Sequence, residues 1–200
     1  MSSFPDRKSL GFSLAELMMG ILIMGVLVSL AMPGLRDMLR NAEVRNAAES
    51  IANGLQRARA EAVARNTNVE FVLGTEFVPG TGFVAGTPSS WVVRTVSAPV
   101  PPIESRPGSD GSGSVTVTAL AADVPVTVPA TFADLTSATT VTFNNFGGTL
   151  AVNGTGTLAL ARIDVTAPEA TQSLRVGIEV GGAPKMCDPG LAAGSSPRAC

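Results

Sequence analysis

The sequence contains no histidine and no tyrosine among its 200 residues. Without histidine, the chain has no Ser–His or Cys–His catalytic pair and no metal site with an imidazole ligand. The acidic residues are scattered, and the glycines at 80–82 and 147–148 lack the Lys-Ser/Thr that follows in a phosphate-binding loop. We therefore expect a protein that is not an enzyme and that holds neither a cofactor nor a metal.

Charged residues are also scarce. They make up 15% of the chain, and the formal net charge is −2, so no broad basic surface points to nucleic acid as the main partner. Apolar residues are concentrated in the first third of the chain. The remainder is rich in glycine, proline, threonine and valine, a composition typical of short strands joined by turns.

The only two cysteines are Cys187 and Cys200. An isolated, even pair in an exported protein is typical of one disulfide, which would hold down the end of the chain. Two reduced thiols are the alternative. Two cysteines without histidine make a poor metal site.

Residues 12–32 form an apolar run that is long enough to cross a hydrocarbon core of about 30 Å as a helix. One interpretation is a secretory signal peptide, with Arg7 and Lys8 in front and a small-residue cleavage site at Ser29-Leu30-Ala31. The other is a retained membrane helix whose leader is removed before the apolar run. The second is favoured by the carboxylate of Glu16 and by a helical pattern that continues past Ala31.

Pro33 follows the apolar run, and proline inside a helix removes a backbone donor and causes a kink. A plain helix end is the alternative. From Leu35 to Ala62 apolar residues recur every three or four positions with charged residues between them, which predicts an amphipathic helix to about Arg65. The simplest role of the charges is a solvated face with local ion pairs. Contact of Arg57, Arg59 and Arg65 with a partner subunit is the alternative.

The rest of the chain is expected to form one antiparallel sheet whose apolar face covers the amphipathic helix. Residues 76–87 and the proline-rich residues 98–113 are expected to be turns and loop, and 144–148 a tight turn. The predicted strands are Val69–Leu73, Ser90–Val96, Ser114–Leu120, Val124–Val128, Thr140–Phe143, Thr157–Thr166 and Gln172–Val180.

The N-terminal residues Gly11, Phe12 and Glu16, with the apolar run behind them, resemble the signal of type IV pilins. The resemblance implies that a prepilin peptidase cleaves after Gly11 and that the amine of Phe12 is then methylated. It also implies that Glu16 pairs with that amine, in the same or a neighbouring subunit, and so fixes the register of assembly. A carboxylate in a membrane-length helix costs roughly 2.5–3.5 kcal/mol on insertion scales, which favours such a partner. A carboxylate that merely reaches the lipid headgroups is the alternative.

The sequence Gln56-Arg57-Ala58-Arg59-Ala60-Glu61-Ala62, followed by Asn66 and a strand, resembles minor pilins and pseudopilins of the GspH/FimT type. So do the Phe143–Gly148 segment, the basic Lys185 before Cys187-Asp188-Pro189, and the terminal Cys200. The proline-rich residues 98–113 have no counterpart in that family. The resemblance implies an α+β type IV pilin fold with a C-terminal disulfide loop. Its parts are a leader at 1–11, a transmembrane and assembly helix at 12–33, an amphipathic helix at 34–66, and a β-rich periplasmic domain at 67–200.

The function implied is that of a minor type IV pilin that helps to initiate or cap a pilus, with a GspH-like pseudopilin of type II secretion as the alternative. The expected location is the bacterial inner membrane, with a single pass, and then the filament. The expected partners are the prepilin peptidase, membrane lipid and other pilins. A third hypothesis is DNA binding during uptake through Arg175, Lys185 and Arg198, although acidic Glu179 and Asp188 lie nearby and the Gly-Arg-x-Arg motif is absent.

Overall fold

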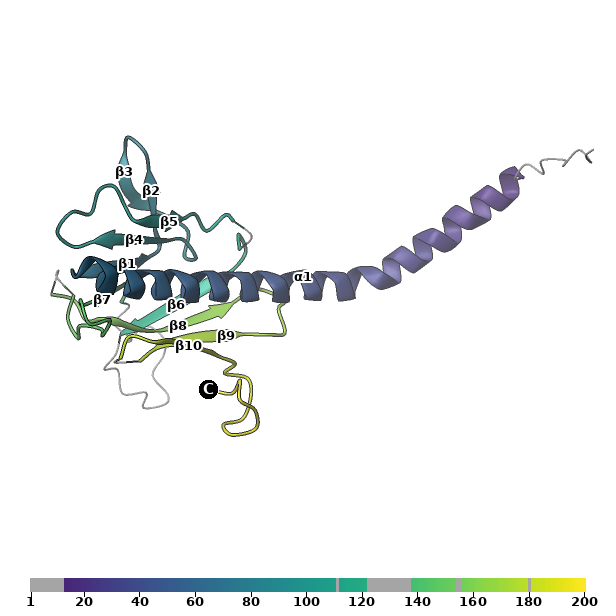
Figure 1. Cartoon of the computed structure of the whole chain (residues 1–200). Helices are drawn as coiled ribbons and strands as arrows, with labels where there is room; N and C mark the ends of the chain where they lie inside the picture. The colour runs from purple at the N-terminus through teal and green to yellow at the C-terminus, as the bar shows by residue number, and fades with distance from the viewer. Residues whose placement is uncertain (1–12, 111, 122–137, 154–155, 180) are drawn as a thin grey trace, which may run out of the picture. The chain divides into compact units, whose positions relative to one another are not determined.

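The computed structural model describes residues 13–110, 112–121, 138–153, 156–179 and 181–200 (Figure 1). The chain divides between Met38 and Leu39 into two units, which we describe separately. A single helix, α1 (Leu14–Arg65), contributes its first part to the N-terminal unit and its second part to the C-terminal unit.

Local signals set both ends of α1. The Ser13 hydroxyl oxygen accepts a hydrogen bond from the backbone N–H of Glu16 at 3.2 Å, so Ser13 is the N-cap. At the other end Asn66 has a φ of 50°, and the Thr67 N–H donates to the Ala62 carbonyl at 3.2 Å. The predicted end of the helix at about Arg65 is therefore confirmed. The helix runs without interruption through position 33, so a helix end at Pro33 is wrong, and a kink there stays a prediction.

In the N-terminal unit, the large apolar side chains of α1 are exposed from Leu14 to Met32. The most apolar 18-residue window has a mean hydropathy of 2.3, and none of it is buried within the chain. By length and composition, this part of the helix is able to cross a bilayer.

In the C-terminal unit, one face of α1 is part of the hydrophobic core, as the spacing of its apolar residues predicts. The side chains on this face are at most 2% exposed; they are Val44, Ala47, Ala48, Ile51, Leu55, Ala58 and Ala62. They pack with Phe71, Phe143 and other apolar side chains of the sheets. Gly54 permits this close approach, because a Cβ there would lie 2.8 Å from Phe71 and 3.0 Å from Trp91.

Two four-stranded antiparallel sheets cover this helix face, so the expectation of one sheet is wrong. The first has the order β5-β4-β1-β7, and its strands are β1 (Val69–Leu73), β4 (Trp91–Thr95), β5 (Glu104–Arg106) and β7 (Thr140–Phe143). The second has the order β10-β9-β8-β6, and its strands are β6 (Thr116–Ala121), β8 (Leu160–Thr166), β9 (Leu174–Ile178) and β10 (Pro184–Cys187). The sequence pattern predicts six of these eight strands, but it does not say which strands pair.

Four strands lie where the sequence predicted none. A hairpin of β2 (Thr75–Val78) and β3 (Gly82–Ala85) occupies the expected turn region 76–87. Its glycines lie at the turn, where Gly80 and Gly82, the first residue of β3, have φ of 88° and 95°. The strand β5 lies within the expected loop 98–113, and β10 was missed near the C-terminus. The predicted strand Val124–Val128 lies outside the described residues.

The turn after β7 is confirmed. The side-chain oxygen of Asn144 accepts hydrogen bonds from the N–H groups of Phe146 and Gly148, both at 3.0 Å. Gly147 has a φ of 79°, and its carbonyl accepts a hydrogen bond from Arg59 at 3.0 Å. This network holds the Phe146 side chain 85% exposed.

Candidate functional sites

The predicted processing site lies outside the described residues, because Gly11 and Phe12 precede the described part of the helix. Cleavage after Gly11 and methylation of Phe12 therefore stay predictions. Glu16 is exposed in the first turn of α1, where the helix dipole favours a carboxylate. Within the part of the chain that is described, no cation pairs with it, so any partner comes from elsewhere.

One face of the apolar helix is hollowed. A shallow depression runs from Glu16 to Val28 and passes Gly20 and Gly25, which have no side chain. Nothing lies within 4 Å of the position that a Cβ would take at either glycine. In membranes, small residues let a second helix approach closely, so this face is suited to helix–helix contact.

The arginines near the end of α1 mostly form bonds within the chain. Arg57 and Arg65 both pair with Glu61, at 2.9 Å and 2.6 Å, and Arg57 also lies 3.6 Å from Glu104. The prediction of local ion pairs is confirmed for these residues. The hydrogen bond from Arg65 holds the pKa of the Glu61 carboxyl below its ordinary value, against the opposing effect of burial.

Because the pKa of Glu61 is lowered in the folded state, its ion pairs should stabilise the protein at neutral pH and lose this effect in acid. The stabilisation is present above the ordinary carboxyl pKa of 4.5 and is lost as the pH falls through the lower pKa of the folded state. Glu61→Gln is expected to lower stability at neutral pH and to flatten the fall in thermal midpoint below about pH 4.5. Melting curves from about pH 3 to 7 measure this, with Glu49→Gln, an exposed i,i+4 partner of Arg45, as the control. If the thermal midpoints of Glu61→Gln and wild type fell in parallel with pH, the pKa of Glu61 would not be the cause of the acid-induced loss of stability.

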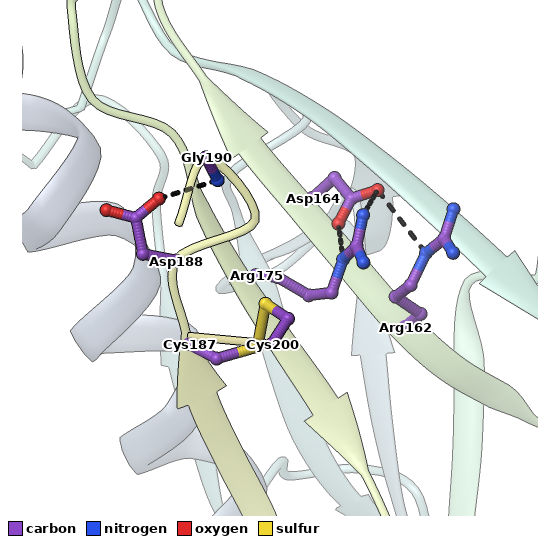
Figure 2. The surroundings of a disulfide bond; sticks show 7 residues. All are labelled: Arg162, Asp164, Arg175, Cys187, Asp188, Gly190 and Cys200. Atoms are coloured by element: carbon purple, nitrogen blue, oxygen red, sulfur yellow. Dashed lines mark hydrogen bonds and ion pairs between the residues drawn. A yellow bond between two sulfur atoms is a disulfide. The ribbon is translucent and has the colours of Figure 1, made fainter. Parts of the chain in front are cut away.

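The cysteine pair is bonded. Cys187 at the end of β10 and Cys200 form a disulfide with a sequence separation of 13, so the alternative of reduced thiols is wrong. The Asp188 N–H donates to the Arg198 carbonyl at 2.6 Å, and Asp188 forms an isolated bridge with Ala199. The Asp188 side chain accepts from the Gly190 N–H at 2.9 Å (Figure 2). The C-terminal segment is thus fastened to β10 by covalent and hydrogen bonds.

We expect the double variant Cys187→Ser/Cys200→Ser to lose about 3 kcal/mol of unfolding free energy, as the chain-entropy argument gives for a loop of this length. Urea unfolding of the full chain in detergent measures the loss. Reduced wild-type protein is the matched control and should give the same value. A double variant as stable as the oxidised protein would show that the loop is already ordered without the bond.

The three cations predicted to contact DNA, Arg175, Lys185 and Arg198, do not form a single cluster. Arg175 on β9 donates to Asp164 at 2.6 Å and 3.3 Å, so its charge is already matched by a carboxylate. Lys185 on β10 is exposed. It and Arg175 line one small hollow on the surface of the sheet. Arg198 is exposed in the disulfide loop and does not line it.

A third cation at this hollow, Arg162 on β8, was missed by the sequence analysis. It lies 3.3 Å from Asp164, the carboxylate that also pairs with Arg175 (Figure 2). The alternation of β8 would have located it, because Ile163 and Val165 are buried and Arg162 and Asp164 therefore share the opposite face. Among the described residues, no group of three or more Cys, Asp and Glu is placed to hold a metal ion.

Comparison with known proteins identifies two regions. Residues 6–32 match the model of the prokaryotic N-terminal methylation motif, and residues 47–182 match the family described as type II transport protein GspH. Both agree with the resemblances found in the sequence. No curated protein matches the chain.

Among solved structures, two crystal forms of the type IV minor pilin FimU from Pseudomonas aeruginosa are similar. They are 13% and 15% identical to this chain, with TM-scores of 0.44 and 0.43. They cover 78% and 79% of this chain, which in turn covers 98% and 95% of theirs. The family match extends over more than half of the sequence, and the chain therefore belongs to the GspH family.

Proposed function

We propose that the chain is a minor pilin that helps to initiate or cap a type IV pilus. The observation on which this rests is the combination of a methylation motif at 6–32 with a GspH-family domain at 47–182 in one chain. In this proposal the chain is a structural subunit rather than an enzyme. Its precursor is cleaved after Gly11 by a prepilin peptidase and methylated at Phe12.

The exposed apolar part of α1 supports assembly through the helix. No described residue covers its side chains from Leu14 to Met32, so in this proposal lipid covers them before assembly and other subunits cover them afterwards. The hollowed face at Gly20 and Gly25 supports close packing of a second helix. Glu16 is the sole carboxylate of this apolar stretch, and its pairing with the Phe12 amine of a neighbour would select one axial register.

The disulfide supports a location for the C-terminal unit outside the cytoplasm. Such bonds persist in oxidising compartments, among them the bacterial periplasm. We therefore place residues 39–200 on the periplasmic side of the inner membrane, with α1 as the single membrane pass until the subunit enters the filament.

A pseudopilin of type II secretion is the second candidate, favoured by the description of the family that the chain matches. A strain in which this gene is deleted separates the two. Loss of surface pili with normal protein secretion is expected if the chain is a minor pilin. Loss of secretion with normal pili would establish the pseudopilin role and overturn our proposal.

DNA binding is the third and weakest candidate. Phosphate contacts need free, clustered cations, and Asp164 already matches the charge of Arg175. Titration of the full chain in detergent with duplex DNA at several salt concentrations tests it. A steep loss of affinity with salt that Lys185→Gln and Arg198→Gln reduce would support DNA contact. An affinity independent of salt would exclude it.

A further inference from the structure

The solvent-facing side of the sheet β10-β9-β8-β6 contains a small cationic hollow. Val176 on β9 faces the core and is fully buried, so the neighbouring Arg175 and Gly177 face outward. In the register of the sheet, Gly177 lies opposite Arg162 of β8 on one side and opposite Lys185 of β10 on the other. The glycine therefore leaves a gap between two cationic side chains.

Gly177 leaves real space in that gap. A Cβ added there would have only one neighbour within 4 Å, the Lys185 carbonyl oxygen at 3.9 Å. The hollow has a volume of about 300 Å³, and its charged lining residues are Arg162, Arg175, Lys185 and Glu179. The disulfide of Cys187 and Cys200 forms one wall. We call this hollow the Gly177 notch.

The charges of the notch are not balanced. Arg162 and Arg175 share the single carboxylate of Asp164 (Figure 2). Lys185 has no ion pair within the described part of the chain, and Glu179 is the one acidic residue in the lining. Three cations thus face two carboxylates, and the excess charge lies beside an open space.

Arg162 also has an unused donor. Its Nε lies 3.3 Å from the Asp164 carboxylate, close enough for an ion pair but without the geometry of a hydrogen bond. This Nε is buried, and no described residue accepts its proton. A buried donor without a partner is rare in native proteins and commonly marks a site for a water or an ion.

We propose that the Gly177 notch binds a small oxyanion, with the oxygens of one phosphate or carboxylate group held between Arg162 and Lys185. Both groups accept several hydrogen bonds from guanidinium and ammonium donors, which is the chemistry the notch offers. A polyanion fits less well, because the cations form one isolated notch beside Glu179 and Asp164 rather than a continuous track. The inference does not depend on the filament proposal.

The test is a titration of the isotopically labelled full chain, in a nonionic detergent free of phosphate, followed by NMR. The probes are inorganic phosphate in one arm and acetate in the other. We expect saturable shifts of the Gly177 and Lys185 amides and of the Arg162 Nε–H, with a dissociation constant in the millimolar range. Saturation by phosphate alone selects a tetrahedral oxyanion, and saturation by both selects any small oxyanion.

Two pairs of variants locate the site. Gly177→Asp puts a carboxylate in the notch and should abolish saturation, whereas Gly181→Asp puts the same charge where nothing lies within 4 Å and should not. Lys185→Gln should weaken binding at least fivefold, whereas Arg198→Gln, which changes an exposed cation outside the notch, should leave it unchanged. Lys185 is at the surface, so its variant tests the proposal even if Gly177→Asp fails to fold.

Three results would overturn the proposal. They are the absence of saturation by either anion, binding that Lys185→Gln leaves intact, and binding of duplex DNA while phosphate and acetate have no effect. Loss of pilus assembly in any variant bears on the proposed function and not on the notch, because the titration is done on the isolated chain.

Discussion

Replacing Glu16 with alanine is expected to leave cleavage after Gly11 intact and to reduce incorporation into the filament at least tenfold. The carboxylate has no partner among the described residues, and in the proposed filament it pairs with the Phe12 amine of a neighbouring subunit. A tenfold change corresponds to about 1.4 kcal/mol, well within the cost of roughly 2.5–3.5 kcal/mol for an ionisable group in a membrane-length helix. Immunoblots of sheared filaments and of membranes measure incorporation, and the mobility of the processed chain measures cleavage.

Two further variants make the Glu16 result specific. Glu16→Gln keeps the size of the side chain and removes its charge, so it should show the same defect. Asp37→Ala removes a carboxylate beyond the apolar stretch and should assemble normally. Normal incorporation of Glu16→Ala would show that the carboxylate does not set the register and only reaches the lipid headgroups.

Replacing Gly182 with alanine is expected to destabilise the C-terminal unit by about 2–5 kcal/mol. Gly182 is buried with a φ of 77°, and a left-handed conformation costs roughly 1–2 kcal/mol for a residue with a Cβ. The new Cβ would also lie 2.0 Å from the Gly147 carbonyl oxygen, and overpacking adds about 1–3 kcal/mol. Urea unfolding of the full chain in detergent measures the change.

The chain offers a matched control for Gly182. Gly194 has nearly the same φ, 79°, but nothing lies within 4 Å of its Cβ position. Gly194→Ala therefore isolates the backbone cost and should lose only about 1–2 kcal/mol. If both variants lost the same unfolding free energy, the turn at Gly147 and the loop at Gly182 would be able to move apart to accommodate the new Cβ.

The parts of the fold that the sequence predicted correctly depend on local signals. α1 ends at Arg65 as its pattern predicted, and its buried face follows the helical repeat. The strand Val69–Leu73 has the bounds that its run of apolar residues indicated. Each of these features is set by neighbours within a few positions along the chain.

The parts that were missed depend on distant contacts or on irregular composition. The division into two sheets follows from β1 pairing with β4 and β7 while β8 pairs with β6 and β9, and no local pattern specifies those partners. The hairpin of β2 and β3 was hidden by the glycines of its turn. Arg162 was overlooked as a candidate because its role depends on Gly177 in the next strand and Lys185 in the strand beyond.

The continuity of α1 has a mechanical consequence. One backbone helix supplies both the exposed apolar segment and the central element of the core, so tension applied at residues 14–32 reaches the C-terminal unit along the helix itself. There the load acts in shear on a row of buried side chains from Val44 to Ala62, which must all lose their contacts together for the helix to slip. A subunit anchored by its helix in the proposed filament would therefore resist extraction through many contacts loaded in parallel rather than through one hinge.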